Sequence, residues 1–399
     1  MVNATLINAT EALVNATNST LLGASVPAKQ GFLQILVDNA MLSFIIPAAL
    51  ISVIMLLVVR NVMPISHFLY ANATIQARSN YMVTDALVSE LTGAKSLKEF
   101  RSLLRETTYE EELEKAKEDL RSFHVSLEKG STDSIIELVK LSPDKSKPLL
   151  NAYLMFFEAK ILKIIYRARL VKETVDEKLV HPIGNIDNTM LKHLLDTVAI
   201  ADIGVVMEPT TYSKIFEKKY SSLEEFEVKI DEFVLNNFVD IINKTKMYDG
   251  EYIMDILYKK IDVSNILAII KFRIRGMEKE KQKSLLVNNK SELCFRFDRM
   301  INAGTLNDFV EGVRGTIYHA PLKKALEKYE KDKALSHFEN ELYKFFKEFV
   351  VSQDLGHTLG PYPLFSYLIK REIELRNLYI ISRGIDAGFS TEKVKEMVI

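Results

Sequence analysis

Three acidic residues on long, largely apolar segments have the chemistry of proton carriers or paired catalytic carboxylates. They are Glu158, Asp262 and Glu374, which occupy equivalent positions of a repeated sequence block. A carboxyl group on an apolar helix can have a shifted pKa, as a general acid or base requires. Each of the three belongs to a different copy of the repeat, however, so they are expected to lie far apart. This separation favours structural pairing over catalysis.

We expect each acid to pair with a base or a backbone amide of its own helical bundle. Arg371, Arg376 and Lys260 are the candidate basic partners. Asn265 and Asn377 also occupy equivalent positions of the repeat, and a buried polar side chain needs a hydrogen-bond partner. All of these residues are therefore interpreted as structural or interface positions.

Motifs for nucleotide, metal or acyl-transfer chemistry are absent from the sequence. Nothing matches the phosphate loops G-x-x-x-x-G-K-[ST] and G-x-G-x-x-G, or the nucleophile elbow G-x-S-x-G. The seven histidines show no metal-binding spacing on one helix. The single cysteine, Cys294, is expected to be a small core residue. We therefore expect no catalytic residue, cofactor, metal or small-molecule substrate.

One sequence block recurs about 110 positions further along the chain, which indicates a fold built of copies. It occupies residues 261–266 and again 373–378, and a glycine follows each copy, at Gly276 and Gly388. A weaker counterpart surrounds Glu158, where the asparagine and the glycine are missing.

A second block begins at Ser96 and recurs at Thr305, each followed three positions later by an acidic residue. This is the pattern of a helix N-cap. A faded copy lies at residues 200–212. Two independently repeated blocks predict three helical modules, and the C-terminal helix is able to pack back across them. The expected modules are 68–175, 176–287 and 288–399.

The composition predicts an all-α protein. Gly at 15 and Pro at 10 are scarce in 399 residues, and 48% of residues are hydrophobic. With 52 basic against 53 acidic residues, the net charge of -1 gives no reason to expect nucleic-acid binding. Long helices are expected at roughly 110–128, 148–173, 223–245, 251–276, 321–350 and 363–386.

Residues 39–59 carry no charge and lie between Asp38 and Arg60. The stretch is about as long as the roughly 20 residues that cross a bilayer, so it predicts a transmembrane helix. The basic residues after it place the N-terminus outside and the main domain in the cytoplasm of a single-pass membrane protein. The tail at 1–38 is either a polar disordered segment or glycosylated. Its sequons are Asn3, Asn8, Asn15 and Asn18.

The C-terminal sequence carries a dense family resemblance. After Gly360-Pro361 it reads Tyr367-Leu368-x-x-Arg371-Glu372-x-Glu374-x-Arg376-Asn377-Leu378-x-x-Ile381-x-Arg383-Gly384-x-x-Ala387-Gly388. With Tyr70-Ala71-Asn72-Ala73-x-Ile75-x-Ala77-Arg78, this resembles the C subunit of archaeal A-type (V-type) ATP synthases, a relative of the eukaryotic V-ATPase d subunit. The resemblance covers residues from about 68 to 399.

The resemblance implies a funnel of three pseudo-symmetric helical modules that joins a membrane rotor ring to a rotating central shaft. The partners would be the proteolipid subunits of the ring, the shaft subunits and the membrane. Proton or sodium flow would turn the ring, and this protein would pass the rotation on without catalysing a reaction. No catalytic residue and no cofactor is carried over from the family.

The N-terminus departs from the family, whose members generally begin near the segment that here starts at Tyr70. A membrane helix on a rotor part would hinder rotation if it lay outside the ring, so residues 39–59 are expected to run through the lumen of the ring. Two other functions remain open. A single-pass membrane scaffold would bind partner peptides in an apolar groove, and a membrane-tethered hydrolase would need polar residues converging in one pocket.

Overall fold

The described part of the chain is helical, which confirms the all-α prediction. The computed structural model describes residues 40–399 except 118, 143, 145 and 355. Within those residues the extended pairing is an isolated bridge between Ile183 and Ile186. The chain divides into two compact units, Met1–Met63 and Pro64–Ile399.

The first unit contains the N-terminal part of helix α3 (Ala40–Ser79). The prediction of a transmembrane helix at 39–59 is wrong, because none of the described helices combines the length and the apolar character that a membrane span needs. The predicted single-pass localisation and the helix through the ring lumen are withdrawn with it. The tail at 1–38 lies outside the described residues, as do its sequons at Asn3, Asn8, Asn15 and Asn18.

The second unit begins with the C-terminal part of α3 and then shows short helices followed by long ones. The first set is α4 (Asp85–Leu91), α5 (Leu97–Leu103), α6 (Glu110–Lys115), α7 (Leu120–Leu141) and α8 (Lys147–Leu170). The next is α9 (Asn188–Asp196), α10 (Ile200–Met207), α11 (Ser213–Phe216), α12 (Leu223–Thr245) and α13 (Gly250–Ile274). The last is α15 (Phe297–Asn302), α16 (Leu306–Gly312), α17 (His319–Asp332), α18 (Ser336–Asp354) and α19 (Tyr362–Asp386). The segments after α8, α13 and α19 contain η1 (Glu177–Leu179), α14 (Lys279–Ser284), η2 (Glu292–Arg296) and α20 (Thr391–Met397).

The helices predicted at 148–173, 223–245, 251–276 and 363–386 are confirmed to within a few residues as α8, α12, α13 and α19. The continuous helices predicted at 110–128 and 321–350 are wrong. In the first, the Asp119 side chain accepts a hydrogen bond from the Ser122 amide (2.8 Å) and starts a new helix. In the second, Lys333 adopts a left-handed conformation (φ 59°) that ends α17.

Two helix starts follow the predicted N-cap pattern. The Ser96 hydroxyl accepts from the Glu99 amide (3.2 Å) at the start of α5. The Thr305 hydroxyl accepts from the Asp308 amide (3.0 Å), and the Asp308 carboxylate in turn accepts from the Thr305 amide (3.0 Å). These bonds satisfy N–H groups that a helix start leaves unpaired.

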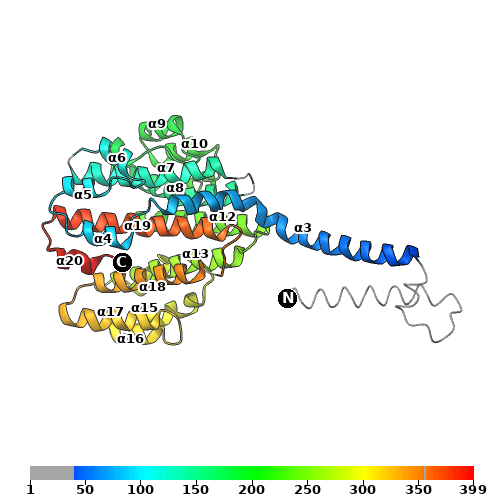
Figure 1. Cartoon of the computed structure of the whole chain (residues 1–399). Helices are drawn as coiled ribbons and strands as arrows, with labels where there is room; N and C mark the ends of the chain where they lie inside the picture. Colours follow the sequence, from blue (N-terminus) through cyan, green and yellow to red (C-terminus); the bar gives the residue numbers. More distant parts are fainter. Residues whose placement is uncertain (1–39, 118, 143, 145, 355) are drawn as a thin grey trace. The chain divides into compact units, whose positions relative to one another are not determined.

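The long helices of the second unit pack against one another in pairs (Figure 1). Helix α8 packs against α12, α13 packs against α18, and α19 packs against α7. The long helix α19 therefore contacts the first set of helices. The module boundaries at 68–175, 176–287 and 288–399, and the funnel shape, stay predictions.

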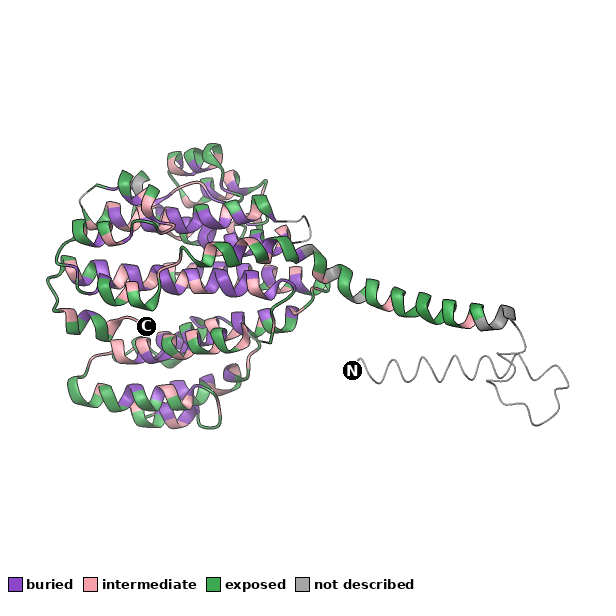
Figure 2. Ribbon diagram, in the orientation of Figure 1, coloured by how far each residue is buried: buried purple, intermediate pink, exposed green. Residues whose placement is uncertain are grey.

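Apolar side chains of these helices face one another, and their buried faces run along α8, α13 and α19 (Figure 2). A second buried cluster joins α5 and α7 to the C-terminal half of α19, through Phe100, Leu104, Phe123, Leu378 and Ile381. Each large apolar side chain buried in this way stabilises the fold by about 1.5–3 kcal/mol. The α19 helix is thus fixed to the start of the second unit mainly by apolar burial.

Candidate functional site

Asp262 lies on the buried face of α13 and accepts three side-chain hydrogen bonds. The donors are Asn289 Nδ2 (2.8 Å), Ser291 Oγ (2.6 Å) and the Tyr318 hydroxyl (2.9 Å). Burial raises the pKa of Asp262, and the three donors lower it by less than burial raises it. The carboxyl group therefore holds the loop before α15 and the end of the Thr305 block against α13.

Glu158 has a similar position on α8, and it binds the loop before α9. Its Oε1 accepts from the Asn185 amide (2.7 Å) and from Asn185 Nδ2 (3.2 Å). Burial raises the pKa of Glu158, while Asn185 and the neighbouring Tyr212 hydroxyl lower it by a smaller amount. A side chain at Gly184 would displace the Glu158 carboxyl group, because a Cβ there would lie 1.9 Å from Glu158 Oε1, and the φ of 56° at Gly184 favours glycine.

Glu374 lies on α19 and pairs with a base on its own helix. Arg371 Nη1 donates to Glu374 Oε1 (2.6 Å), and the Val83 amide donates to Glu374 Oε2 (3.1 Å). The Arg371 guanidinium also lies over the Tyr109 ring, 4.4 Å from its centroid. Burial raises the pKa of Glu374 despite the opposing charge of Arg371.

The three carboxyl groups are not brought together into one site. Glu158, Asp262 and Glu374 have different hydrogen-bond partners, and each fixes a loop or a short helix to its own long helix. An arrangement of this kind positions backbone segments. It does not converge on a space where a substrate could react, so it gives no support to paired catalysis.

Asn265 and Asn377 each bind a main-chain segment at the same sequence distance, 22 residues further on. Asn265 Nδ2 donates to the Val287 carbonyl (2.8 Å), and the Val287 amide donates to Asn265 Oδ1 (3.0 Å). Asn377 makes the same two bonds with Ile399, at 2.7 Å and 3.1 Å. Both asparagines are buried, and each holds the segment that follows its helix.

The helices α8, α13 and α19 meet at a charged junction. Lys260 Nζ and the Tyr153 hydroxyl both donate to Glu372 Oε2, at 2.6 Å and 2.9 Å. Lys260 Nζ also lies 5.1 Å from the centre of the Phe156 ring. Burial tends to raise the pKa of Glu372, but the neighbouring lysines outweigh it and the pKa is lowered. A pocket of about 200 Å³ opens here, lined by Lys160, Tyr343, Arg376 and others.

Sequence reasoning identified Lys260 but missed Tyr153 and Glu372 of this junction. Glu372 stands in the C-terminal motif, two residues before Glu374, as Lys260 stands two residues before Asp262. That shared register is the signal that could have found it. The other candidate base, Arg376, donates to Glu339 Oε1 (3.2 Å) away from the repeated acids.

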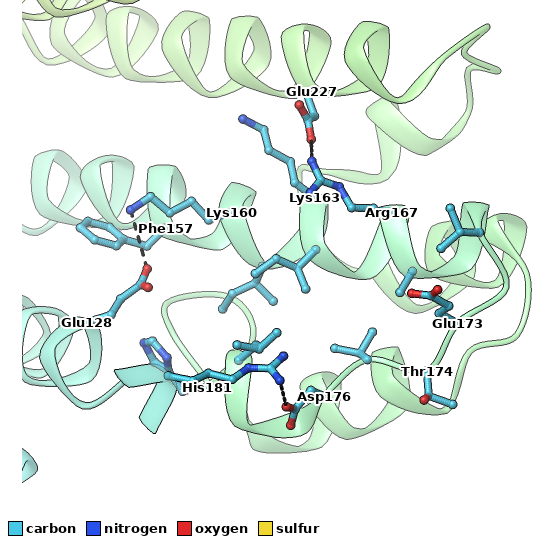
Figure 3. A pocket seen from close by; sticks show the side chains of 17 residues that line it. Glu128, Phe157, Lys160, Lys163, Arg167, Glu173, Thr174, Asp176, His181 and Glu227 are labelled. Carbon is cyan, nitrogen blue, oxygen red and sulfur yellow. Dashed lines mark hydrogen bonds and ion pairs between the residues drawn. The ribbon is translucent and has the colours of Figure 1, made fainter. Parts of the chain in front are cut away.

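A larger groove of about 760 Å³ lies along α8 (Figure 3). Its walls come from α7, α8, α12 and the segment after α8, which includes η1. Apolar side chains form the floor, and ion pairs stand at the rim. The rim pairs include Arg121–Asp176 (3.1 Å), Lys160–Glu128 (3.7 Å) and Arg167–Glu227 (3.1 Å).

The described residues place few groups where they could bind a metal ion or act as a reactive thiol. Among the described residues, no group of three or more His, Cys, Asp or Glu side chains is placed to hold a metal ion. Cys294 is half-buried, and its Sγ donates to Asn289 Oδ1 (2.9 Å). The thiol thus belongs to the polar network around Asp262.

The family model and the similar proteins found for this chain belong to one family. Residues 71–397 match the family model described as ATP synthase (C/AC39) subunit. The chain is 26% identical to the C subunit of the A-type ATP synthase of Methanocaldococcus jannaschii over 358 residues, which cover 86% of this chain and 88% of that protein. The corresponding protein of Thermococcus onnurineus is 24% identical, over 82% of this chain and 89% of its own length. That of Methanosphaera stadtmanae is 22% identical, over 89% and 94%.

Proposed function

Because the chain belongs to the ATP synthase (C/AC39) subunit family, with relatives that are the C subunits of A-type ATP synthases, we propose that it is the central-stalk connector of such a synthase. In this role it couples the membrane rotor ring to the rotating shaft during proton- or sodium-driven ATP synthesis. Its partners are the proteolipid subunits of the ring and the subunits of the shaft. It takes part in the complex without catalysing the reaction.

The observation that carries the proposal is the family match over nearly the whole compact helical unit. The internal geometry supports it in a second way. A part that transmits torque must resist deformation, and the long helices α8, α13 and α19 are tied together through Glu372. The buried acids and asparagines tie the loops to the same three helices.

The order of helix packing supports the three-module funnel within this proposal. Each long helix that carries a repeated acid packs against a long helix of the next set, and the last, α19, packs against α7 of the first. Modules at 68–175, 176–287 and 288–399 would then close into a ring around α8, α13 and α19. Such a ring offers one end to a circular rotor and the other to a shaft.

The proposal predicts that the chain is needed for coupling and dispensable for catalysis. In membranes from cells that lack it, ATP hydrolysis by the catalytic head should persist, while ATP-driven ion pumping should be lost. Restoring the chain should restore pumping. Pumping that is unchanged without the chain, or hydrolysis that disappears from isolated heads lacking it, contradicts the proposed role.

A charge reversal tests the junction more finely. Glu372→Lys places a second cation beside Lys260 and should lower the ratio of ions pumped to ATP hydrolysed, because like charges repel across α13 and α19. Asp298→Lys is the matched control, since Asp298 pairs with Lys283 (2.7 Å), both side chains are exposed, and neither lines the pocket at the junction. Equal effects of the two reversals would argue against a role for the junction in coupling.

A further inference from the structure

The segment from the end of α13 into α15 is strongly basic. Residues 271–299 contain nine basic and four acidic residues, a net charge of +5, although the net charge of the whole chain is -1. Like charges held this close together repel one another and oppose folding. Positive charge is thus concentrated in one short segment of a nearly neutral protein.

The fold of this segment does not require the excess charge. Residues 167–195 lie at the same distance from Glu158 as residues 271–299 lie from Asp262, and they contain five basic and four acidic residues. Residues 383–399, at the end of α19 and beyond it, contain three of each. Because these counterparts fold with nearly balanced charge, the excess at α13 needs a reason other than folding.

The cations of the basic segment lie on one connected surface. Arg273 Nη1 donates to the Ala303 carbonyl (2.7 Å), which fixes the end of α13 beside α15. Both α14 and the 3-10 turn η2 contact α15, and Lys283 Nζ pairs with Asp298 Oδ1 at 2.7 Å. Five other cations are exposed and form no ion pair with the described residues. They make up the basic surface: Lys271, Arg275, Lys279, Lys281 and Arg299.

An exposed aromatic side chain accompanies these cations. Phe295 belongs to η2 and is 89% exposed, whereas its neighbours Leu293 and Phe297 are buried. Ile274, at the end of α13, is 52% exposed. Aromatic and arginine side chains are enriched at the centres of protein–protein interfaces, where an aromatic anchor fills a pocket of the partner. A bare phenylalanine beside unpaired cations therefore has the composition of an interface.

The partner that fits this surface is an acidic protein segment. Opposite charges attract it, and charge complementarity fixes its register. Nucleic acids and anionic membranes present dense negative charge without interruption. Glu278, Glu280 and Glu292 are exposed among the cations and would be repelled by a partner of that kind. A protein can place carboxylates opposite the cations alone and an apolar pocket opposite Phe295.

We propose that the basic surface and Phe295 form the binding site for an acidic segment of another subunit. Carboxylates of that segment pair with Lys279, Lys281 and Arg299, and an apolar pocket of the partner receives the Phe295 ring. That the partner is a member of the synthase rests on the proposed function. Asp298→Lys adds to the positive charge here, so the surface gives that control variant no route to weaker coupling.

The test places a photo-crosslinking phenylalanine analogue in the full-length chain within the complex purified from membranes. One variant carries it in place of Phe295, where an aromatic ring is retained. The control carries it in place of Val205 on α10, which is 70% exposed and lies outside the basic surface. We expect the Phe295 position to cross-link to a peptide of one other protein of the synthase that is rich in Asp and Glu. The Val205 position should not cross-link to that peptide.

A charge reversal separates electrostatic binding from chance proximity. Lys279→Glu combined with Lys281→Glu should lower the Phe295 cross-link yield about tenfold, because two attractive pairs become repulsive. The matched control is Lys393→Glu combined with Lys395→Glu on α20, the counterpart of α14, and it should retain the yield. Circular dichroism shows whether the reversed chain is folded. If it is not, the single exposed change Arg275→Glu takes its place, with an expected loss of about threefold.

The outcomes also distinguish this inference from the proposed function. An unchanged yield in a folded reversed chain overturns the inference, as does a Phe295 cross-link to lipid, to nucleic acid or to a second copy of this chain. If ring and shaft proteins are recovered with the chain but Phe295 cross-links to no protein of the synthase, the inference fails and the connector role stands. If Phe295 cross-links to an acidic segment of an unrelated protein and no synthase protein is recovered, the proposed function fails while the acidic-segment site stands.

Discussion

Removing the carboxyl group of Glu374 should destabilise the fold strongly, because it leaves a buried cation without its partner. Arg371 is 0% exposed, and Glu374 is 6% exposed. Arg371 Nε and Nη2 have no hydrogen-bond partner among the described residues, so the charge is compensated by the bond from Nη1 to Glu374 and by the contact with the Tyr109 ring. Breaking a buried ion pair by deleting one partner costs about 3–5 kcal/mol. Glu374→Ala should therefore lose about that amount.

The assay is urea unfolding of the full chain, followed by circular dichroism. With a slope of about 3 kcal/mol per molar urea, a loss of 3–5 kcal/mol lowers the midpoint by roughly 1–1.7 M. The control is Asp298→Ala, which removes the exposed partner of the exposed Lys283 and should cost less than about 1 kcal/mol.

A double variant isolates the unpaired charge as the cause. Arg371→Met combined with Glu374→Met replaces the pair by apolar side chains of similar length, which is often neutral or stabilising. It should recover at least about 2 kcal/mol of the loss, although the bond from the Val83 amide is still missing. A double variant no more stable than Glu374→Ala, or a Glu374→Ala midpoint within about 0.3 M of the wild type, would refute the reasoning.

Three further changes test the packing around the long helices. Asn265→Leu should lower the free energy of unfolding by about 2–4 kcal/mol, because the amide and carbonyl of Val287 are left unpaired. Hydrogen exchange at the Val287 amide should accelerate, and unchanged exchange would count against the bond. Burial raises the pKa of Asp262 above its ordinary 3.8, so the folded state retains a proton that the unfolded state has released. The stability of wild type relative to Asp262→Asn should therefore fall as pH rises from about 4 through the raised folded pKa; urea unfolding between pH 4 and 7 checks this, and a relative stability that rises over that range contradicts it. Gly384→Ala should cost about 1–3 kcal/mol by displacing Val394, with α20 more sensitive to proteolysis; an unchanged melting temperature and digestion pattern would show that α20 does not pack there.

The long helices were predictable because their apolar periodicity is strong and extends over many residues. Helix α12 was predicted at its observed bounds, and α8, α13 and α19 differ by a few residues. The breaks that the prediction missed depend on single residues without a strong signal. Lysine has no preference for the left-handed conformation that Lys333 adopts, and Asp119 is one of many acidic residues in its segment.

The candidate site was predictable only where the repeat pointed to it. The repeat singled out Asp262, Glu374, Asn265 and Asn377, but it could not show that both asparagines bind main chain 22 residues further on. Every residue of this kind offers the same main-chain amide and carbonyl, so the residue type at Val287 or Ile399 does not reveal that its main chain is bound. The contact between Tyr153 and Glu372 spans 219 positions and depends on how three helices meet, which a single sequence does not specify.

The measurement that tests the connector role most directly is cross-linking mass spectrometry on the chain affinity-purified from native membranes in mild detergent. We predict cross-links from one and the same chain to proteolipid subunits of the ring and to subunits of the shaft, with the proteins of the catalytic head recovered alongside them. Recovery of unrelated partners in place of the synthase, or cross-links confined to stationary parts of the complex, would contradict the account.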